Sequence, residues 1–592
     1  MNATLTEIQT LTQYFSDLDI QMVNLVERMT ASTDFPLQLA VAFASQALDQ
    51  GNVCADLHTL AGQSWPALLD RGDAALRAAY AALPPTPALD EWLAALTTPA
   101  ARLVIGDAAS TDTLFVCRGT NVYLRRYWTY ERSVEAALLR LHQPLPHDAP
   151  LEPLLDRYFK AATPLQRVAA RAAATRQLTL LSGGPGTGKT YTLARIVALL
   201  AESRKGGFNV AIATPTGKAA SRAVESIQKA KQELRNEGVS DAILQAIPET
   251  ATTIQRLLGP QHHSAYFKHT SEQPLDVDLV VIDETSMVDL PLMAKLLEAL
   301  PSTCRLLLVG DSEQLASVAP GRIYGDLCAA AQPEGPLAGA LTQLTESRRF
   351  PPDSAIGQLS AALQSKPDCA WHVLQTVQGE HLHVHDAARF EYDDGFSHLV
   401  RSAFEVFLQT SDPAAALQAS ETFRVLCALR KGPFGVDAVN ARIETLLTGH
   451  HGFAPQGRFY DHQLILITAN TPSLNLTNGD IGVVLRTSNN DLHAWFKTSD
   501  TVRSVPVHLL PPFETAFAMT IHKAQGSEFS TLAMIVPAEA HSPLLTRELL
   551  YTGITRTAIR DNHGALHLWC TQASFETAAQ RKTERTTGLF DA

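Results

Sequence analysis

The sequence predicts an α/β protein with two parallel sheets flanked by helices, a small β insertion in the second sheet's domain and a mainly helical N-terminal region. Three observations lead to this expectation. Apolar runs of strand length alternate with helical patterns from about residue 160 onward, and each run ends in polar residues. A glycine-rich octapeptide, GGPGTGKT, follows the first of these runs. The first hundred residues instead show helical patterns and alanine-rich stretches.

Length and composition restrict the class of protein. The chain has 592 residues, enough for about three to five domains, and its 45% hydrophobic and 18% charged content is typical of globular proteins. No apolar run is long enough to span a membrane, and the first residues lack the order of a signal peptide, so we expect a cytoplasmic protein with no membrane partner. Seven scattered cysteines without a C-x-x-C pair predict reduced thiols rather than disulfides or a metal centre.

The charge is unevenly distributed. The net charge of −12 argues against indiscriminate binding of nucleic acid. Residues 1–100 contain eleven acidic and three basic residues, so most of the acidity lies in this part of the chain. Two interpretations stay open: a solvated helical face, or a domain that docks on another protein.

The expected elements follow in chain order. Residues 1–110 form the helical N-terminal domain, and residues 111–150 hold a hairpin, a helix and a linker. The elements expected here are a helix at Pro36 to Gln50 that ends at Gly51, strands at Leu114 to Cys117 and Val122 to Tyr127, a helix at Glu131 to Leu141, and a proline-rich linker at His142 to Pro153.

Two α/β domains are expected after the linker, at residues 160–345 and 346–592. A β insertion near 470–512 is indicated by short β runs and an Asn478-Gly479 turn between them. Because ligands of open α/β sheets bind at the carboxyl ends of the strands, the polar residues there should meet in one crevice. The expected strands are Leu178 to Ser182, Val210 to Ala213, Leu279 to Asp283 and Leu306 to Gly310 in the first domain, and Phe423 to Ala428, Leu464 to Thr468, Leu532 to Val536 and Leu566 to Trp569 in the second.

The octapeptide has the G-x-x-x-x-G-K-T pattern of a phosphate-binding loop. Its backbone N–H groups can turn toward a phosphate chain, Lys189 can reach the β- and γ-phosphates, and the Thr190 hydroxyl can ligate Mg²⁺. We therefore predict ATP and Mg²⁺ as cofactors. The predicted cradle consists of Gly183, Gly184, Pro185, Gly186, Thr187, Gly188, Lys189 and Thr190.

Further polar residues at strand ends fit phosphoryl transfer. Asp283 and Glu284 end an apolar strand, where the first can hold Mg²⁺ and the second can orient and deprotonate the attacking water. Gln314 follows the next strand and can sense the γ-phosphate through that water. Arg349 and Arg556 are candidates for the additional cations that the transition state requires, although each taken singly fits a surface arginine.

The motifs occur in an order that resembles superfamily-one DNA helicases, and they are most similar to the RecD branch. The resemblance covers about Leu165 to Cys570 and implies two RecA-like P-loop domains with an SH3-like β insertion. It also implies that Gln166 reads adenine. The motifs that carry it are the octapeptide, Thr214 to Ala220, Asp283 to Met287, Gly310 to Leu315, Arg349, Thr520 to Phe529 and Tyr551 to Thr557.

The resemblance assigns DNA contacts to two segments, one in each α/β domain. Two such segments whose separation changes with ATP binding give stepwise movement, and the similarity implies 5′ to 3′ travel on single-stranded DNA. Ala524 departs from the serine that is usual in its motif. Residues 260–274 stand where relatives place a strand-separating pin, although a surface loop is also compatible with them. The predicted DNA-contacting residues are Thr214, Pro215, Thr216, Lys218, Thr520, His522 and Lys523.

The RecD resemblance implies partners. It predicts a heterotrimer with RecB and RecC subunits that acts on duplex ends, degrades linear DNA and processes double-strand breaks for homologous recombination. No strand shows the spaced Asp, Glu and Lys of a nuclease, so the nuclease is expected in another subunit. Residues 1–110 lack the helix-hairpin-helix modules of free-standing relatives. An autonomous repair helicase and a regulatory ATPase without motor activity remain alternatives.

One histidine cluster is given little weight. His381, His383 and His385 alternate and would share one face of a strand, as metal ligands can. No fourth ligand accompanies them, so a polar edge strand is the favoured interpretation.

Overall fold

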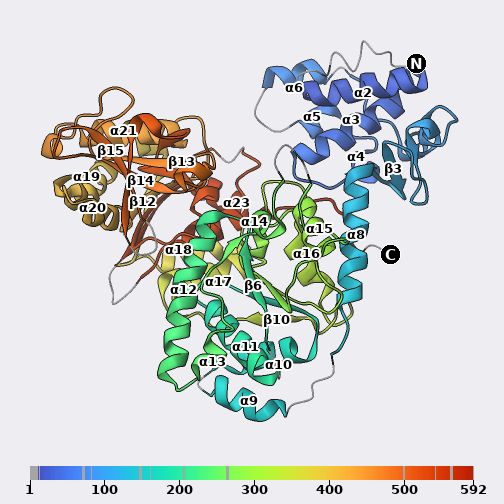
Figure 1. Cartoon of the computed structure of the whole chain (residues 1–592). Helices are drawn as coiled ribbons and strands as arrows, with labels where there is room; N and C mark the ends of the chain where they lie inside the picture. The colour runs from blue at the N-terminus through green and yellow to red at the C-terminus, as the bar shows by residue number, and fades with distance from the viewer. Residues whose placement is uncertain are drawn as a thin grey trace.

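A computed structural model describes residues 11–590, apart from 12–13, 70–73, 82, 146–149, 161, 205–206, 262–263, 265, 498–500, 540–541 and 560–563. Figure 1 shows three parts: a mainly helical N-terminal region at the upper right, a first parallel sheet below it, and a second parallel sheet with an antiparallel one at the left. No helix among the described residues is long and apolar enough to cross a membrane. The predicted fold class is confirmed.

Helices dominate the N-terminal region and enclose a core that contains Trp65 and Trp92. The predicted helix before Gly51 is α3, and Gly51 ends it with a φ of +84°. The elements are α2 (Asp17–Thr30), α3 (Phe35–Asp49), β1 (Ala55–Asp56), α4 (Leu57–Leu60), α5 (Trp65–Leu68), α6 (Ala74–Tyr80), α7 (Leu89–Leu96), β2 (Ile105–Gly106), β3 (Phe115–Arg118) and β4 (Asn121–Leu124), with sheet order β1-β4-β3-β2.

The predicted hairpin is present as the antiparallel pair β3 and β4, but its second strand is shorter than expected. Helix α8 (Arg125–Leu141) begins at Arg125, so the strand predicted to continue to Tyr127 is wrong there, and the helix predicted from Glu131 starts earlier. Pairing ends at Leu124 because Phe115 is the first residue of its partner strand. In the predicted linker, whose residues 146–149 lie outside the described residues, the last part already belongs to α9 (Leu151–Tyr158).

The first parallel sheet has the strand order β10-β5-β9-β8-β6-β7. The four predicted strands are confirmed, and two short strands that were not predicted complete the edges. The strands are β5 (Leu178–Gly183), β6 (Val210–Thr214), β7 (Thr252–Thr253), β8 (Leu279–Ile282), β9 (Arg305–Gly310) and β10 (Leu341–Leu344); the helices are α10 (Pro164–Thr175), α11 (Lys189–Ser203), α12 (Gly217–Asn236), α13 (Asp241–Leu244), α14 (Ile254–Leu258), α15 (Leu290–Glu298) and α16 (Ile323–Ala330).

The second parallel sheet has the order β11-β20-β19-β12-β18. Three of the four strands predicted for it are confirmed. Its strands are β11 (Leu382–Asp386), β12 (Phe423–Cys427), β18 (Ala518–Thr520), β19 (Thr531–Ile535) and β20 (Ala565–Cys570); its helices are α17 (Ala355–Ser365), α18 (Ala370–Thr376), α19 (Asp394–Gln409), α20 (Pro413–Ser420), α21 (Val436–Leu447), α22 (Arg547–Ile554) and α23 (Gln572–Gln580).

The fourth predicted strand, Leu464 to Thr468, lies elsewhere. It is β13 (Gln463–Ile467) in an antiparallel sheet of order β16-β15-β14-β13-β17, so its assignment to the parallel sheet is wrong. The sequence predicts short β runs on both sides of the Asn478-Gly479 turn. In the structure the Gly479 N–H donates to the Ile467 carbonyl oxygen of β13, and the turn is followed directly by β14, whereas the described residues between β13 and the turn form no strand that it would connect to β14. The remaining strands are β14 (Ile481–Arg486), β15 (Leu492–Lys497), β16 (Val502–Pro506) and β17 (Phe513–Thr515).

Within residues 260–274, the described residues of the first domain contain a short antiparallel pairing. Pro260 and Phe267 make a β-bridge, and the Lys268 N–H donates to the Gly259 carbonyl oxygen at 2.8 Å. Tyr266 is 70% exposed. Residues 262, 263 and 265 of the expected pin lie outside the described residues.

Candidate functional site

The phosphate-binding loop joins β5 to α11 at the carboxyl edge of the first sheet. Every residue of β5 is buried, and the chain turns where this buried strand ends, which is the edge at which ligands of open α/β sheets bind. The Lys189 ammonium donates to the carbonyl oxygens of Gly183 and Gly184, at 2.5 and 3.0 Å. Gly188 caps α11 with a φ of +81°, a backbone conformation that L side chains rarely adopt. The N-terminus of α11 and the Lys189 ammonium therefore lie at the same turn of the backbone. Their positive charge suits a bound anion.

Gln166 lies against this loop. It belongs to the first turn of α10, where its Oε1 accepts from the Thr163 N–H at 3.0 Å in a capping box. A Cβ added to Gly188 would lie 2.8 Å from Gln166 Nε2, so the amide group touches the loop backbone. This side chain is only 2% exposed. The structure thus places Gln166 beside the phosphate-binding loop.

The two acidic residues at the end of β8 face the same loop. Burial and the neighbouring Glu284 charge raise the pKa of Asp283 to about 6, although the Lys189 charge lowers it. Glu284 has a φ of +55° and a ψ of +40°, a left-handed conformation that costs a non-glycine residue about 1–2 kcal/mol. Such strain is often found at functional sites.

Gln314 is buried at the end of β9 and donates to Asp311 Oδ2 at 2.9 Å. The Tyr551 hydroxyl of α22 donates to the same Asp311 oxygen at 3.2 Å. A Cβ on Gly184 would lie 2.8 Å from Tyr551 Oη, so this tyrosine of the second domain also touches the phosphate-binding loop. Burial raises the pKa of Asp311, and Lys189 opposes that shift. The first and second domains are therefore in direct contact at the nucleotide site.

Arg349 lies against the phosphate-binding loop, and Arg556 lies near Glu284. Arg349 forms an ion pair with Glu528, and a Cβ added to Gly186 would lie 2.3 Å from Arg349 Cβ. Arg556 is 4% exposed, and its Nε donates to the Thr552 carbonyl oxygen at 3.0 Å. Burial lowers the pKa of Arg556 to about 10, while Glu284 raises it and Arg349 lowers it further. Both predicted arginines thus lie in one electrostatic cluster with Glu284.

These residues fit ATP and Mg²⁺. The glycines provide a backbone cradle, Lys189 provides a cation whose ammonium binds carbonyl oxygens of the loop, and Thr190 stands in the first turn of α11. Asp283 adds a carboxylate at the end of β8, which is separated from β5 by β9, and its pKa is influenced by the Lys189 charge. A hydroxyl and a carboxylate are hard oxygen ligands of the kind that Mg²⁺ prefers.

The first predicted DNA segment follows β6. Thr214 is fully buried and its hydroxyl donates to the Thr216 carbonyl oxygen at 2.8 Å, while the Thr216 side chain caps α12. Pro215, between them, is partly exposed. Burial and the nearby Arg222 and Arg424 charges lower the pKa of Lys218 to about 7. Of these four residues, Lys218 is the one whose side chain can carry a positive charge, and its surroundings disfavour that charge when no anion is bound.

The antiparallel sheet closes over this segment. A Cβ on Gly217 would lie 2.8 Å from Thr477 Oγ1, and one on Gly479 would lie 3.9 Å from Lys218 Cβ. Asp480 Oδ2 accepts from the Thr477 N–H at 2.7 Å, which fixes the turn. The first domain and the β insertion thus meet where the first predicted DNA segment lies.

The second predicted DNA segment follows β18. The Lys523 N–H donates to Thr520 Oγ1 at 3.3 Å, and the Lys523 ammonium forms an ion pair with Glu514. Burial lowers the pKa of His522, and the charge of Arg585 lowers it further. Glu514 also pairs with Arg430 at 3.2 Å. The Lys523 ammonium is therefore paired with the Glu514 carboxylate of its own domain.

Three site residues had no role assigned from the sequence. Tyr551 binds Asp311, Ser347 Oγ donates to the Pro185 carbonyl oxygen at 2.8 Å, and Glu528 pairs with Arg349. Tyr551 and Glu528 lie inside motifs that the sequence did single out, so their positions were available as a signal. Ser347 has no such signal, because its role depends on β10 running beside β5.

Family comparisons match three segments of the chain. Residues 166–320 match an AAA domain and residues 515–560 match a UvrD-like helicase C-terminal domain. Residues 12–123 match the RecBCD enzyme subunit RecD, N-terminal domain. The RecBCD enzyme subunit RecD of Mycolicibacterium smegmatis is 38% identical over 578 residues, which cover 96% of this chain and 96% of that protein.

The chain belongs to the RecD family. The resemblance to RecD that the motifs indicated is thus confirmed, and with it the prediction of an ATP-dependent helicase. The ATP-dependent RecD2 DNA helicase of Deinococcus radiodurans is 32% identical, over 71% of this chain and 50% of that protein. A solved structure of Bacteroides Pif1 bound to ssDNA is 15% identical with a TM-score of 0.38, and covers 71% of this chain and 94% of that one.

The histidine cluster lies apart from the RecD motifs, on β11 at the edge of the second sheet. The rings of His383 and His385 stack on His567, with ring centroids 4.6 and 5.5 Å away, and His385 also stacks on Trp569. Within the described part of the chain no group of three or more His, Cys, Asp or Glu residues is arranged to hold a metal ion. The cluster is a stacked ladder of rings.

Proposed function

We propose that this RecD-family chain is a 5′ to 3′ single-stranded-DNA translocase and helicase, driven by ATP and Mg²⁺, and that it works as a subunit of a helicase–nuclease complex. The observation that carries the motor is the contact of Tyr551 with both Asp311 and Gly184. This contact joins the second domain to the phosphate-binding loop, so a structural change at the bound nucleotide moves groups of both domains.

The residues of the site divide the chemistry of ATP hydrolysis among them. Lys189 and the loop backbone hold the phosphates, Gln166 holds the adenine, and Thr190 with Asp283 would hold Mg²⁺. Bound Mg²⁺ supplies charge neutralisation at the phosphate oxygens. Glu284 accepts the proton of the water that attacks the γ-phosphorus, as the bond to the β–γ bridging oxygen breaks. Gln314 orients that water, and Arg349 and Arg556 stabilise the charge that develops.

The partner pairs at the site give hydrolysis a mechanical consequence. Arg349 is paired with Glu528, which lies in the same motif as Thr520, His522 and Lys523. When Arg349 turns toward a phosphate, Glu528 loses that partner, and the DNA-facing segment of the second domain is free to shift. Lys218 and Lys523 then exchange their protein neighbours for DNA phosphates in turn.

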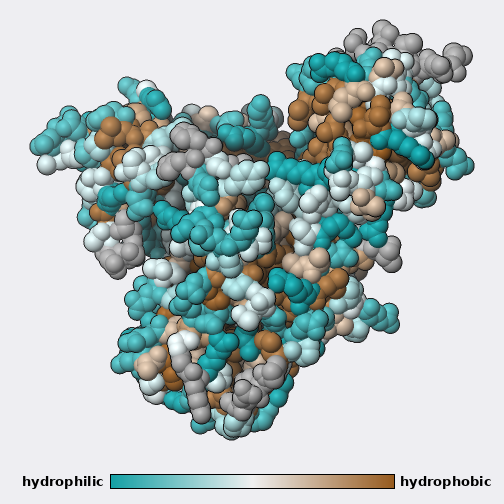
Figure 2. Space-filling model, turned by 45° about the vertical axis from the view of Figure 1, so that its right-hand side comes forward, coloured by the Kyte–Doolittle hydropathy of each residue, from teal (hydrophilic) through white to brown (hydrophobic). Residues whose placement is uncertain are grey.

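Docking on partner subunits is supported by the N-terminal region. Leu18, Leu25 and Met29 recur on α2 at helical spacing and are 62%, 36% and 46% exposed. Figure 2 shows apolar residues gathered on the N-terminal region at the upper right. Such a stripe on an acidic domain suits a protein partner better than DNA. We assign it to the other subunits of a RecBCD-type complex, in which another subunit cuts DNA.

A polarity and partner experiment tests this function. The chain, purified with its co-transcribed proteins, is given duplexes that carry a 5′ or a 3′ single-stranded tail. We expect ATP-dependent displacement from the 5′-tailed duplex that is lost in Lys189→Gln. Displacement from the 3′ tail that depends on Lys189 would reverse the polarity, and a chain that elutes alone would favour the autonomous helicase. The cytoplasmic location and the role in double-strand-break repair belong to the same proposal.

A further inference from the structure

Residues 581–590, here called the strap, leave the second domain after α23. The Arg547 N–H donates to the Arg581 carbonyl oxygen at 2.8 Å, and the N–H and hydroxyl of Thr583 donate to the buried Glu548 carboxylate, the closest contacts at 3.0 Å. Arg547 and Glu548 begin α22, the helix that carries Tyr551. The start of the strap is therefore fixed to the element that reaches the nucleotide site.

The middle of the strap binds the loop that follows Gln314. Arg585 Nη2 donates to the Ser317 carbonyl oxygen at 2.6 Å, and its Nη1 donates to the carbonyl oxygens of Ala319 and Gly321, at 2.9 and 2.8 Å. Three carbonyl groups thus converge on one guanidinium. The planar, rigid fork of an arginine can satisfy several acceptors at fixed angles, which a lysine ammonium cannot do as well.

The same loop touches the other two parts of the molecule. The Leu315 N–H donates to Thr552 Oγ1 at 3.0 Å, and the Leu315 carbonyl oxygen accepts from Gln525 Nε2 at 3.1 Å. Both partners belong to the second domain. On the other side, the Gly321 N–H donates to the Gly51 carbonyl oxygen at 3.0 Å in the N-terminal region. Arg585 therefore binds the loop between its two inter-domain contacts.

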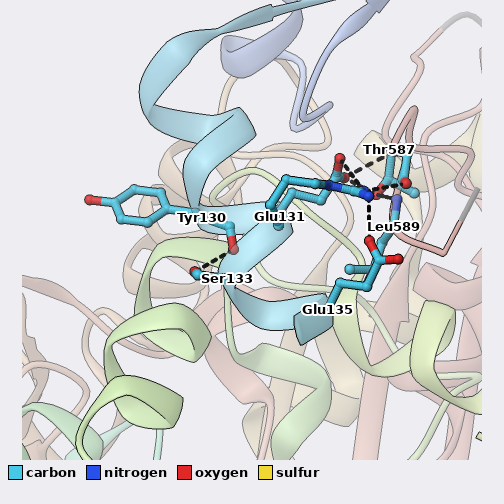
Figure 3. Close-up of polar contacts among 8 residues, drawn as sticks. Tyr130, Glu131, Ser133, Glu135, Thr587 and Leu589 are labelled. Carbon is cyan, nitrogen blue, oxygen red and sulfur yellow. Dashed lines mark hydrogen bonds and ion pairs between the residues drawn. The ribbon is translucent and has the colours of Figure 1, made fainter. Parts of the chain in front are cut away.

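The far end of the strap is anchored in the N-terminal region beside α8 (Figure 3). Glu131 is fully buried, and its Oε1 accepts from the Thr587 hydroxyl and the Gly588 N–H, at 2.6 and 2.9 Å. The Val53 N–H donates to the Thr586 carbonyl oxygen at 2.8 Å, and Leu589 is buried in the adjoining core. A buried carboxylate needs such donors, and the strap supplies two of them, while Arg132 of α8 pairs with the same carboxylate at 3.4 Å.

Gly588 makes that anchor sensitive to any side chain. A Cβ at this position would lie 2.1 Å from Tyr123 Oη and 3.3 Å from Glu131 Oε2. A residue larger than glycine cannot fit here unless the strap or Tyr123 shifts, so it disturbs the anchor at a position three residues from Arg585. This allows the anchor to be broken without touching the loop itself.

We propose that Arg585 is a positioning residue for ATP hydrolysis: through the strap, the N-terminal region sets the position of the loop that carries Gln314. The inference rests on the ATPase function proposed above. A partner that binds the N-terminal region then acts on hydrolysis through the strap. A purely structural staple would need no contact near Gln314, whereas the three Arg585 acceptors lie three to seven residues beyond it.

The test uses the full chain and steady-state ATP hydrolysis with saturating single-stranded DNA. We expect Arg585→Ala to lower kcat about tenfold, since small misplacements of a catalytic group reduce rates strongly, with KM for ATP changed less than about twofold. Arg585→Lys should recover part of the loss, and Gly588→Val should reproduce it. Lys582→Ala removes a positive charge from an exposed position of the same strap and should leave kcat unchanged.

Thermal melting separates this effect from loss of fold. The proposal requires the fall in kcat at a temperature at which each variant is folded. Equal kcat for Arg585→Ala and Lys582→Ala would overturn it. Should Arg585→Ala fail to fold, Arg585→Lys and Gly588→Val carry the same comparison. A wild-type chain whose hydrolysis ignores single-stranded DNA would overturn the proposed motor function, whereas the strap proposal is decided by the comparison of Arg585→Ala with Lys582→Ala.

Discussion

The nucleotide site and the two segments that we propose face DNA lie on the same domain boundary but are built differently. At the nucleotide site, Gln314 and Tyr551 already converge on Asp311, and Arg556 is buried among charges. At the DNA-facing segments, Lys523 is held by Glu514 and Lys218 lies under the turn at Thr477 to Asp480. In the proposed motor the catalytic groups are thus preorganised, whereas Lys218 and Lys523 exchange their protein neighbours for DNA phosphates, and this difference lets ATP hydrolysis control how tightly DNA is held.

The largest effect is expected from Lys189→Gln. It removes the cation that the phosphate cradle directs at the nucleotide, so ATP hydrolysis should fall by about a thousandfold and unwinding should cease. The fold should survive, because Lys189 binds only loop carbonyl oxygens. Hydrolysis and thermal melting check both statements. Retained strand separation would contradict the assignment of the nucleotide site.

A smaller loss is expected from Arg556→Lys, about a hundredfold in kcat, because a lysine keeps the charge but loses the planar fork. Arg349→Lys provides the matched comparison, since that arginine is partly exposed and paired with Glu528. Single-turnover hydrolysis measures both variants. If neither slows the chemical step, the arginines do not complete the site across the domain boundary.

Glu514→Gln tests the DNA-facing half of the comparison. The change releases Lys523 and Arg430 from their shared carboxylate, so single-stranded DNA should bind about three- to tenfold more tightly at low salt. Lys523→Gln should do the opposite and lower the slope of log affinity against log salt by about 0.7. Fluorescence titration at several salt concentrations gives both values. Unchanged affinity in Glu514→Gln would mean that the pair does not compete with DNA.

The smallest effects concern pH, and they have opposite signs in the two regions. Asp283 must be ionised to bind a metal, and burial and Glu284 raise its pKa to about 6, so hydrolysis should fall as pH decreases through about 6. Lys218 has a pKa of about 7, lowered by burial, and DNA phosphate favours its charged form, so DNA affinity should fall as pH rises above about 7. Lys218→Arg should remove this second dependence. Parallel pH profiles of kcat and of DNA affinity test it.

The comparison also explains how far the sequence could go. The nucleotide site could be predicted because Lys189, Asp283 and Gln314 each follow an apolar strand, and parallel strands bring their carboxyl ends together. The fold class could be predicted from the same alternation.

The misassigned strand shows the limit of apolar patterning. Gln463–Ile467 is as buried as any strand of the parallel sheets, and nothing in its own residues states that its neighbours run antiparallel. Likewise β7 and β10 are too short or too polar to stand out, although β10 places Ser347 against the phosphate-binding loop. Strand pairing depends on two segments of the chain, whereas an apolar pattern describes each segment by itself.

The strap could not be found from the sequence at all. Thr587 and Glu131 are 456 residues apart, and neither belongs to a motif. In the sequence, Arg585 is an ordinary basic residue outside any motif. Its three acceptors are backbone carbonyl groups, which every residue has, so the sequence does not identify them.

One measurement tests the central claim most directly: the rate of ATP hydrolysis by the full chain with and without single-stranded DNA, with Lys189→Gln as the background. A motor whose nucleotide site is coupled to its DNA-facing segments should hydrolyse ATP at least about tenfold faster when the strand is present. The same rate with and without DNA, above the Lys189→Gln background, would show an ATPase that does not sense DNA and would contradict the account.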